Sequence, residues 1–530
     1  MSLPLTILSY IITFFSGYFC LEKVYKRWVK PGFDKYLVKH MFTYNNDSFA
    51  HDTIRYRFRE IMYTLNNYYE EAVVKLSKGK SEKELMDLIK NRPFSYSKMM
   101  KDDFSEPKSL FAFLKKNDYF DDNDKTVLED FYSECRNKKD NIKGSNYGAY
   151  FSDLPFIDAE HVFYFYILDT FYGLNDDIKK YMSDNTFPDY IPDPYKKKKR
   201  KAIEDDLCKG LPNDENSEEE HSSILECLKI IIELNKILEG HSDKGMKSTK
   251  TDEKLKEITN LSLYSNTNDL SQLRDRVRKV IDNNSIYPNN LEYFLKCIKL
   301  LKKDTKVNYL VDNSGVEFFS DLTFAYVLIQ VSNINKVSLL INKLPIFVSD
   351  VIESDYEHMI NIVEKYLKNK KNNIPDDYLK ALELIKDKIK EKQIELHSDF
   401  NWNMPTSYDI MAKNGYKEVF TESNSILIIK GDLNYRRLVT DKNWHYSDDI
   451  LEHTDYIECP TLVVRSIKSD LVIDYDKKGK KKYTEWEKKD KYWRENGEYG
   501  VIRFINDPNN PLSFWKKRKL GVIRFINSRR

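Results

Sequence analysis

The sequence predicts an α/β fold, in which a mostly parallel, doubly wound sheet is flanked by helices and preceded by a helical amino-terminal lobe. From residue 307 onward, apolar runs of strand character alternate with helix-length segments, which is typical of a parallel sheet covered on both faces. Before that point, apolar residues recur at helical spacing. The chain has 530 residues, enough to bury a large core and to form more than one lobe.

Residues 1–40 contain an apolar amino-terminal segment. The first 21 residues carry no charged side chain, and residues 3–21 have nearly the length needed to cross a bilayer. Basic residues follow this segment and none precedes it, which is not the pattern of a cleaved signal peptide. Two interpretations stay open: a membrane anchor through residues 3–21, or an amphipathic or buried helix. If the segment spans a membrane, the basic flank predicts that the rest of the chain stays cytoplasmic. The expected location is therefore cytoplasmic, with or without a membrane tether.

Residues 41–300 are predicted to form a mostly helical lobe. Apolar positions recur at helical spacing in residues 52–65 and 159–171, and residues 224–238 and 291–301 are amphipathic. A polar insertion near residues 196–223 contains a basic run at 196–201 and acidic residues at 218–220. Charges of opposite sign so close together favour a solvated helix face and loop over a polyanion-binding patch.

Residues 301–505 are predicted to form the α/β lobe. Runs of strand character lie at residues 306–311, 336–342, 393–396, 425–429 and 461–464. The carboxyl ends of parallel strands are where ligands bind in an open sheet, so the polar residues that follow these runs are candidates for a site. Residues 506–530 form a tail, in which the heptapeptide of residues 500–506 recurs unchanged at 521–527. Two copies are too few for a repeat architecture.

Composition excludes several classes of protein. Lysine and arginine total 86 and aspartate and glutamate 84, a balance that argues against a dedicated nucleic-acid binder. No glycine-rich nucleotide-binding motif follows a strand. The six cysteines include no CxxC pair, so we expect neither a disulfide framework nor a structural zinc site, and a reducing compartment fits.

Oxygen-bearing side chains follow the first two strand runs. Asp312 and Asn313 come directly after residues 306–311, and Asp350 follows the second run. Carboxylate and amide oxygens suit a hard divalent cation. Asp and Asn are also common helix N-caps, and spacing alone does not separate the two interpretations.

The ends of two later strands favour the interpretation as a site. The run at 425–429 leads into Gly431 and Asp432, and the run at 461–464 leads into Arg465 and Lys468. Glycine lets the backbone approach another group closely. Together these ends supply acids, a glycine turn, an arginine and a lysine. A cation and basic groups around a charged transition state are what phosphoryl transfer needs.

Four phrases of the sequence together resemble a known family. They are DNSGVE at 312–317, LPIFVSD at 344–350, KGDLNYR at 430–436 and RSIK at 465–468. They are similar to the signature of the third subfamily of the damage-control phosphatases, metal-dependent sugar-phosphate phosphatases also described as acidic-residue methyltransferases. Weaker matches are TIRYR at 53–57, DPY at 193–195, SNTNDLS at 265–271 and GEYGV at 497–501.

The sequence departs from the family pattern at a few positions. Ser466 replaces the threonine of the RTxK motif, and Ser265 replaces a glycine. Phe165 and Tyr166 stand where a pair of arginines is expected. If those arginines bind substrate in the family, the substrate preference of this chain differs.

The resemblance implies a role for each matching residue. Asp312, Asn313 and Asp350 would bind one divalent metal, Mn²⁺ first, with Ni²⁺, Co²⁺ or Mg²⁺ as substitutes. Glu317 and Asp350 match positions assigned to S-adenosylmethionine in the methyltransferase description. The substrate-binding residues would be Asp312, Asn313, Asp432, Leu433, Asn434, Tyr435, Arg436 and Lys468. The catalytic residues would be Asp312, Asp350 and Lys468.

The expected function is therefore a metal-dependent phosphatase that hydrolyses small sugar phosphates such as fructose 1-phosphate or fructose 6-phosphate. The first alternative is an S-adenosylmethionine-dependent protein carboxyl methyltransferase. A site of two acids and a lysine suits phosphate better than a sulfonium. The second alternative is a non-catalytic or membrane-tethered interaction protein in which the site has decayed, and the intact acids argue against such decay. Sequence leaves open whether a metal-bound water or an aspartate attacks the phosphate.

Overall fold

A computed structural model describes residues 50, 53–78, 80, 93–94, 99, 108–110, 112, 121–141, 154–185, 197–211, 221–240, 244–265, 285–347, 349–473, 477–494 and 496–506. The apolar segment at 1–40, the DPY phrase at 193–195, most of the SNTNDLS phrase and the second copy of the duplicated heptapeptide lie outside these residues. No helix in the described part is both long and apolar enough to cross a membrane.

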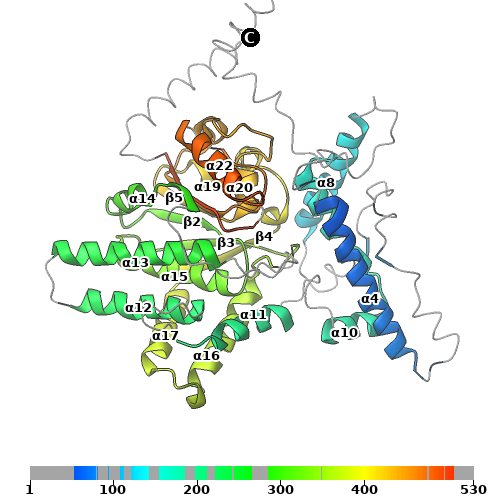
Figure 1. The fold of residues 1–530 in the computed structure, drawn as a ribbon, viewed down its shortest axis with the longest axis horizontal. Coiled ribbons are helices and arrows are strands. Elements are labelled where there is room, and N and C mark those ends of the chain that lie inside the picture. Colours follow the sequence, from blue (N-terminus) through cyan, green and yellow to red (C-terminus); the bar gives the residue numbers. More distant parts are fainter. Residues whose placement is uncertain are drawn as a thin grey trace, which may run out of the picture.

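A seven-stranded sheet with the order β1-β7-β6-β5-β2-β3-β4 forms the centre of the α/β lobe (Figure 1). Neighbouring strands are parallel except for the antiparallel pair β6 and β7. The predicted α/β class is thus confirmed. The strands are β1 (Ile286–Asn289), β2 (Lys306–Leu310), β3 (Val337–Asn342), β4 (Ile394–Asp399), β5 (Ser425–Lys430), β6 (Thr461–Ser466) and β7 (Gly500–Ile505).

The five predicted strand runs correspond to β2 through β6. The structure adds β1 and β7, which the sequence pattern did not reveal. Strand β1 is only four residues long and contains Pro288, which normally argues against a strand except at a sheet edge, where β1 lies. Strand β7 is the first copy of the duplicated heptapeptide, less its last residue.

An apolar core lies on each face of the sheet, and alternate residues of a strand contribute to opposite cores. In β5, Ile426 and Ile428 join one apolar core, whereas Leu427 and Ile429 join another. The first core is shared with α11 (Lys197–Cys208), α12 (Ser223–Glu239), α13 (Lys244–Tyr264), α14 (Leu291–Ile298), α15 (Val316–Val331), α16 (Glu353–Lys368) and α17 (Asp376–Lys390). The second is shared with α18 (Tyr408–Met411), α19 (Lys417–Thr421), α20 (Asp432–Leu438) and α21 (Ile450–His453).

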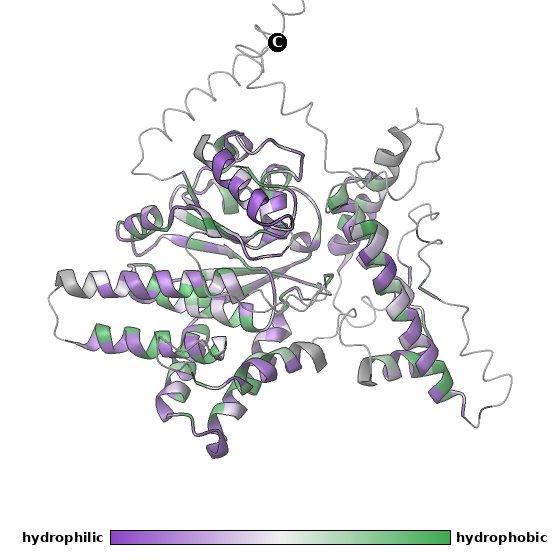
Figure 2. Ribbon diagram, viewed as in Figure 1, coloured by the Kyte–Doolittle hydropathy of each residue, from purple (hydrophilic) through white to green (hydrophobic). Residues whose placement is uncertain are grey.

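The helices carry hydrophobic and hydrophilic residues in turn along their length, as expected for helices that cover a sheet (Figure 2). Helix α22 (Lys477–Lys489) is the most uniformly hydrophilic. Helices α12 and α13 fall within the predicted helical lobe, yet both pack on α15 against the sheet. The α/β lobe therefore includes segments well before residue 301.

The remaining helices form a separate apolar core. It contains residues of α4 (Phe58–Leu76), α8 (Asp122–Asn141), α9 (Phe156–Tyr172) and α10 (Asp176–Asn185), and Phe58 stacks on Phe163 with ring centroids 3.6 Å apart. Figure 1 shows α4, α8 and α10 grouped beside the α/β lobe. Leu344 and Phe400, which follow β3 and β4, belong to the same core. The helical lobe is thus joined to the carboxyl ends of these strands.

A buried ion pair also joins the two lobes. Arg436 of α20 donates to Glu160 of α9 over 2.5 Å and to both carboxylate oxygens of Asp441 over 2.9 and 3.0 Å. The Arg436 guanidinium lies 4.7 Å from the ring centroid of Phe156. Burial raises the pKa of Glu160, and the charge of Arg436 opposes that rise. Loss of either partner would leave a desolvated charge poorly compensated.

We predict that Glu160→Gln lowers the free energy of unfolding by about 1–3 kcal/mol, because a buried hydrogen bond between two charged groups becomes one to a neutral amide. Urea denaturation monitored by circular dichroism would measure this change. The control is Glu204→Gln, which removes an exposed pair with Arg200 on α11. That change should cost less than about 1 kcal/mol. Equal effects of the two substitutions would contradict the proposed importance of the inter-lobe pair.

Candidate active site

The ends of β2 and β5 form the topological switch point of the sheet. These strands are neighbours, and the chain proceeds from β2 to β3 and β4 on one side and from β5 to β6 on the other. Ligands of open α/β sheets bind in the crevice at such a point. Asp312 and Asn313 follow β2 there, and Gly431 and Asp432 follow β5.

The Asp312 carboxylate lies directly against Gly431. A Cβ atom at position 431 would overlap the Cβ, Cγ and Oδ2 atoms of Asp312. Gly431 also has a φ of +97°, a conformation that side chains other than glycine rarely adopt. Glycine is therefore required at this position for two reasons: the backbone has a positive φ, and a side chain would overlap Asp312.

The segment that contains Asp350 lies beside Asp312 and Asn313. Asn313 and Asp350 form an antiparallel β-bridge, and the backbone N–H of Val351 donates to the Asp312 carbonyl over 3.2 Å. The structure therefore brings the backbone segments of the three predicted metal-binding residues together. No group of three or more His, Cys, Asp or Glu side chains in the described ranges is placed to hold a metal. The predicted set contains two acids and one amide, and its metal-binding role stays a prediction.

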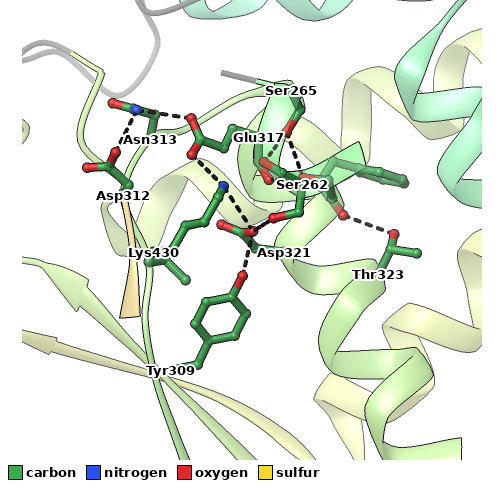
Figure 3. Close-up of polar contacts among 12 residues, drawn as sticks. Ser262, Ser265, Tyr309, Asp312, Asn313, Glu317, Asp321, Thr323 and Lys430 are labelled. Atoms are coloured by element: carbon green, nitrogen blue, oxygen red, sulfur yellow. Dashed lines mark hydrogen bonds and ion pairs between the residues drawn. The ribbon is translucent and has the colours of Figure 1, made fainter. Parts of the chain in front are cut away.

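A buried polar network connects Asn313 to α15 and β5 (Figure 3). The Asn313 side-chain nitrogen donates to Asp312 over 3.1 Å and to Glu317 over 3.0 Å. Lys430 donates to the other oxygen of Glu317 over 2.5 Å and lies 3.4 Å from Asp321. All these side chains except that of Asp312 are almost fully buried. Glu317, predicted to contact S-adenosylmethionine, thus has a neighbour on each carboxylate oxygen.

The charged groups of this network change one another's pKa values. Burial raises the pKa of Glu317, and the nearby Asp321 carboxylate adds to the rise, whereas the charges of Lys430 and Lys468 oppose it. The effect of Lys468 shows that its charge acts on the same cluster. Lys430 keeps a pKa above its usual value because Asp321 and Glu317 outweigh the opposing effect of burial. The cluster therefore favours a charged lysine in the interior.

Sequence reasoning missed Lys430 and Asp321 as members of the buried network behind the site. Sequence analysis placed Lys430 only in the phrase KGDLNYR and gave it no role, because a lysine next to an apolar strand is normally solvent-exposed. Asp321 is four residues after Glu317 on the otherwise apolar α15. That spacing on a buried helix was the available signal, because carboxylates at i and i+4 lie on one helix face.

Asp432 holds the loop that carries Lys468. One carboxylate oxygen of Asp432 accepts from the Arg465 guanidinium over 2.8 Å and from the Lys468 backbone N–H over 3.0 Å. The Arg465 guanidinium lies 4.1 Å from the ring centroid of Tyr435. Asp432 and Tyr435 were predicted to bind substrate. In the structure both also contact Arg465 of β6.

The other predicted substrate residues of α20 have different surroundings. The Asn434 amide donates to the carbonyls of Val311 and Lys430 over 3.1 and 2.8 Å, which ties the ends of β2 and β5 together. Arg436 points to Glu160 and Asp441, as described above, and Leu433 is half-buried. A substrate role for these residues stays a prediction.

Two family departures also have defined places. Phe165 is fully buried in the core of the helical lobe, so an apolar side chain suits its surroundings. The hydroxyl of Ser265 lies 2.9 Å from that of Ser320, which in turn donates to the Glu317 carbonyl over 2.6 Å. Ser265 therefore packs behind the polar network.

The fold and the site define an α/β protein with acidic and basic side chains at its topological switch point. The profile of the "Damage-control phosphatase ARMT1-like domain" matches residues 174–483, more than half of the chain. The chain belongs to this family.

Curated relatives carry the name damage-control phosphatase ARMT1. The Mus musculus protein is 23% identical over 279 residues, which cover 49% of this chain and 61% of the relative. The Danio rerio protein is 27% identical over 209 residues, which cover 38% of this chain and 43% of the relative. The Rattus norvegicus protein is 26% identical over 309 residues, which cover 55% of this chain and 66% of the relative. The matches thus span between 43% and 66% of the length of these relatives.

We predict that Gly431→Ala displaces the Asp312 carboxylate and lowers the free energy of unfolding. Backbone strain alone would cost about 1–3 kcal/mol, and the overlap with Asp312 should make the loss larger than that. The measurement is chemical denaturation. Gly415→Ala is a matched control, because Gly415 has a φ of +104° and no atom within 4 Å of an added Cβ. If the two variants lose equal stability, the contact between Asp312 and position 431 does not constrain the site.

Proposed function

We propose that this protein is a metal-dependent phosphatase that hydrolyses small sugar phosphates, with fructose 1-phosphate and fructose 6-phosphate as the first candidates. The observation that carries the proposal is the meeting of Asp312, Asn313 and Asp350 at the switch point of the sheet. Membership of the damage-control phosphatase family supports phosphate-ester hydrolysis as the reaction class.

The residues at this point fit a hard divalent cation. They offer two carboxylates and one amide oxygen, the ligand types that Mn²⁺ and Mg²⁺ prefer. Because the Asn313 nitrogen donates to Asp312 and Glu317, its side-chain oxygen is left on the side of the amide away from Glu317 (Figure 3). We therefore assign Asp312, Asn313 and Asp350 as the residues that would hold Mn²⁺, or Ni²⁺, Co²⁺ or Mg²⁺. Such an ion neutralises phosphate charge and lowers the pKa of a bound water.

Lys468 is the group we assign to stabilise negative charge on the phosphate. Its backbone is held by Asp432, which is itself fixed by Arg465. Preorganised positive charge of this kind acts strongly because little reorganisation accompanies the reaction. Rigid placement of Lys468 relative to Asp312 would orient the sugar phosphate for attack.

We predict that Asp312→Ala and Asp350→Ala each reduce phosphate release by at least about 100-fold, because a metal ligand contributes several kcal/mol of transition-state stabilisation. Phosphate release would be measured on a sugar-phosphate panel with added Mn²⁺, Ni²⁺ or Co²⁺, and with a chelator that should abolish it. The control is Asp304→Ala, an exposed aspartate at the opposite end of β2, which should retain wild-type rates. No phosphate release from any compound with any of these metals would refute the proposal.

Protein carboxyl methylation is the competing reaction. We predict that S-adenosylmethionine carrying a labelled methyl group transfers no label to an acidic protein. Each carboxylate oxygen of Glu317 already has a protein neighbour, Lys430 or Asn313. Label transfer that disappears in Asp350→Ala and persists in Asp304→Ala would favour the methyltransferase instead.

A further inference from the structure

The orientation of the Asn313 side-chain amide is determined by its surroundings. Its nitrogen donates to one oxygen of Asp312 and one of Glu317. Ionised carboxylates only accept hydrogen bonds, so the amide oxygen cannot occupy the position of the nitrogen without facing two acceptors. Asp312 and Glu317 thus fix which way the Asn313 oxygen points.

Glu317 can act in this way because both of its oxygens are acceptors. One accepts from Asn313 and the other from Lys430, and the residue is 2% exposed. Lys430 is 1% exposed, and its partners besides Glu317 include Asp321. An ammonium and an amide N–H₂ therefore meet the same buried carboxylate from opposite sides.

Asp321 holds Lys430 from the far side of the network. Its Oδ1 atom accepts from Tyr309 over 2.6 Å and from Ser262 over 2.7 Å, and lies 3.4 Å from the Lys430 nitrogen. Figure 3 shows Asp321 on the side of Lys430 away from Asn313. Asp321 therefore supports the lysine from the side of the network away from the proposed metal ligands.

We propose that Glu317, held by Lys430, is a positioning residue that orients the Asn313 amide so that its oxygen faces the divalent cation. This inference rests on the proposed function, because it assumes that Asn313 is a metal ligand. It gives Glu317 a role distinct from contact with S-adenosylmethionine. Groups that hydrogen-bond to metal ligands commonly set the ligand orientation in this way.

Glutamine at position 317 tests the proposal because it has the shape of glutamate but only one accepting oxygen. The charged Lys430 competes for that oxygen, which leaves the glutamine N–H₂ facing Asn313. Asn313 must then turn its own oxygen inward and its N–H₂ outward. An outward N–H₂ group cannot ligate a cation.

The measurement is the dissociation constant for Mn²⁺, obtained from the electron paramagnetic resonance signal of free Mn²⁺ in titrations of the full chain. We predict that Glu317→Gln raises this constant by about 10- to 100-fold, the usual cost of losing a partner of a metal ligand. This readout does not depend on turnover. Cooperative thermal unfolding of the variant would establish that it is folded.

Asp321→Asn is the matched control. It also removes one buried charge beside Lys430, but asparagine retains an oxygen for Tyr309 and Ser262. Its Mn²⁺ dissociation constant should stay within about twofold of wild type, because Asp321 contacts Lys430, Tyr309 and Ser262 on the side of the network away from Asn313. A loss equal to that of Glu317→Gln would show a general structural effect and overturn the proposal.

The double variant Glu317→Gln/Lys430→Met provides a rescue. Without the ammonium, the glutamine oxygen can turn to Asn313 and restore its orientation, so Mn²⁺ should bind more tightly than to Glu317→Gln alone. If Glu317→Gln fails to fold, the double variant is compared with wild type directly. Its Mn²⁺ dissociation constant should then be less than about tenfold higher than that of wild type. Weaker binding than this, or no rescue of a folded single variant, overturns the proposal.

The two proposals can fail separately. If wild-type protein binds Mn²⁺ and Glu317→Gln binds it equally well, the positioning role is wrong and the proposed function stands. If wild-type protein binds no divalent cation and releases no phosphate, the proposed function is wrong, and the positioning role is wrong with it.

Discussion

The approach of the Asp312 carboxylate to Gly431 is the constraint on which the site depends. Two parallel strands, β2 and β5, end side by side, and only a glycine backbone leaves room for an acid between them. Asn434 then ties both strand ends with its amide. The network from Asn313 to Lys430 lies directly behind this contact. Displacement of one strand end would therefore alter the carboxylate, its amide neighbour and the buried lysine together.

Much of the fold was predictable because the central strands are short apolar runs between turn residues. Their polar ends predicted the site, since parallel strands bring their carboxyl ends to one edge. The strands β1 and β7 were not predictable in the same way: one contains Pro288, and the other pairs antiparallel to β6. Periodicity also could not assign α12 and α13 to a lobe, because an amphipathic pattern shows that a helix has an apolar face but not what that face packs against.

The missed parts of the site share a physical cause. The interactions of Lys430 with Glu317 and of Arg436 with Glu160 join residues far apart in the chain. In sequence, a lysine or an acid is expected to be solvated, because burial of an unpaired charge is costly. Only the three-dimensional arrangement shows that each charge meets an opposite charge. The helical lobe is thus connected to the site through α20, an arrangement that no local pattern could reveal.

The position of β7 has a consequence for how the protein is made. Strand β1 precedes the other strands in the chain, yet its partner is β7, whose first residue is Gly500. During synthesis, β1 has no strand to pair with until that residue has left the ribosome, and β6, which is made later, keeps an open edge until the same point. Exposed edges invite pairing with other chains. Newly made copies on crowded polysomes are therefore most vulnerable to aggregation just before their last strand emerges.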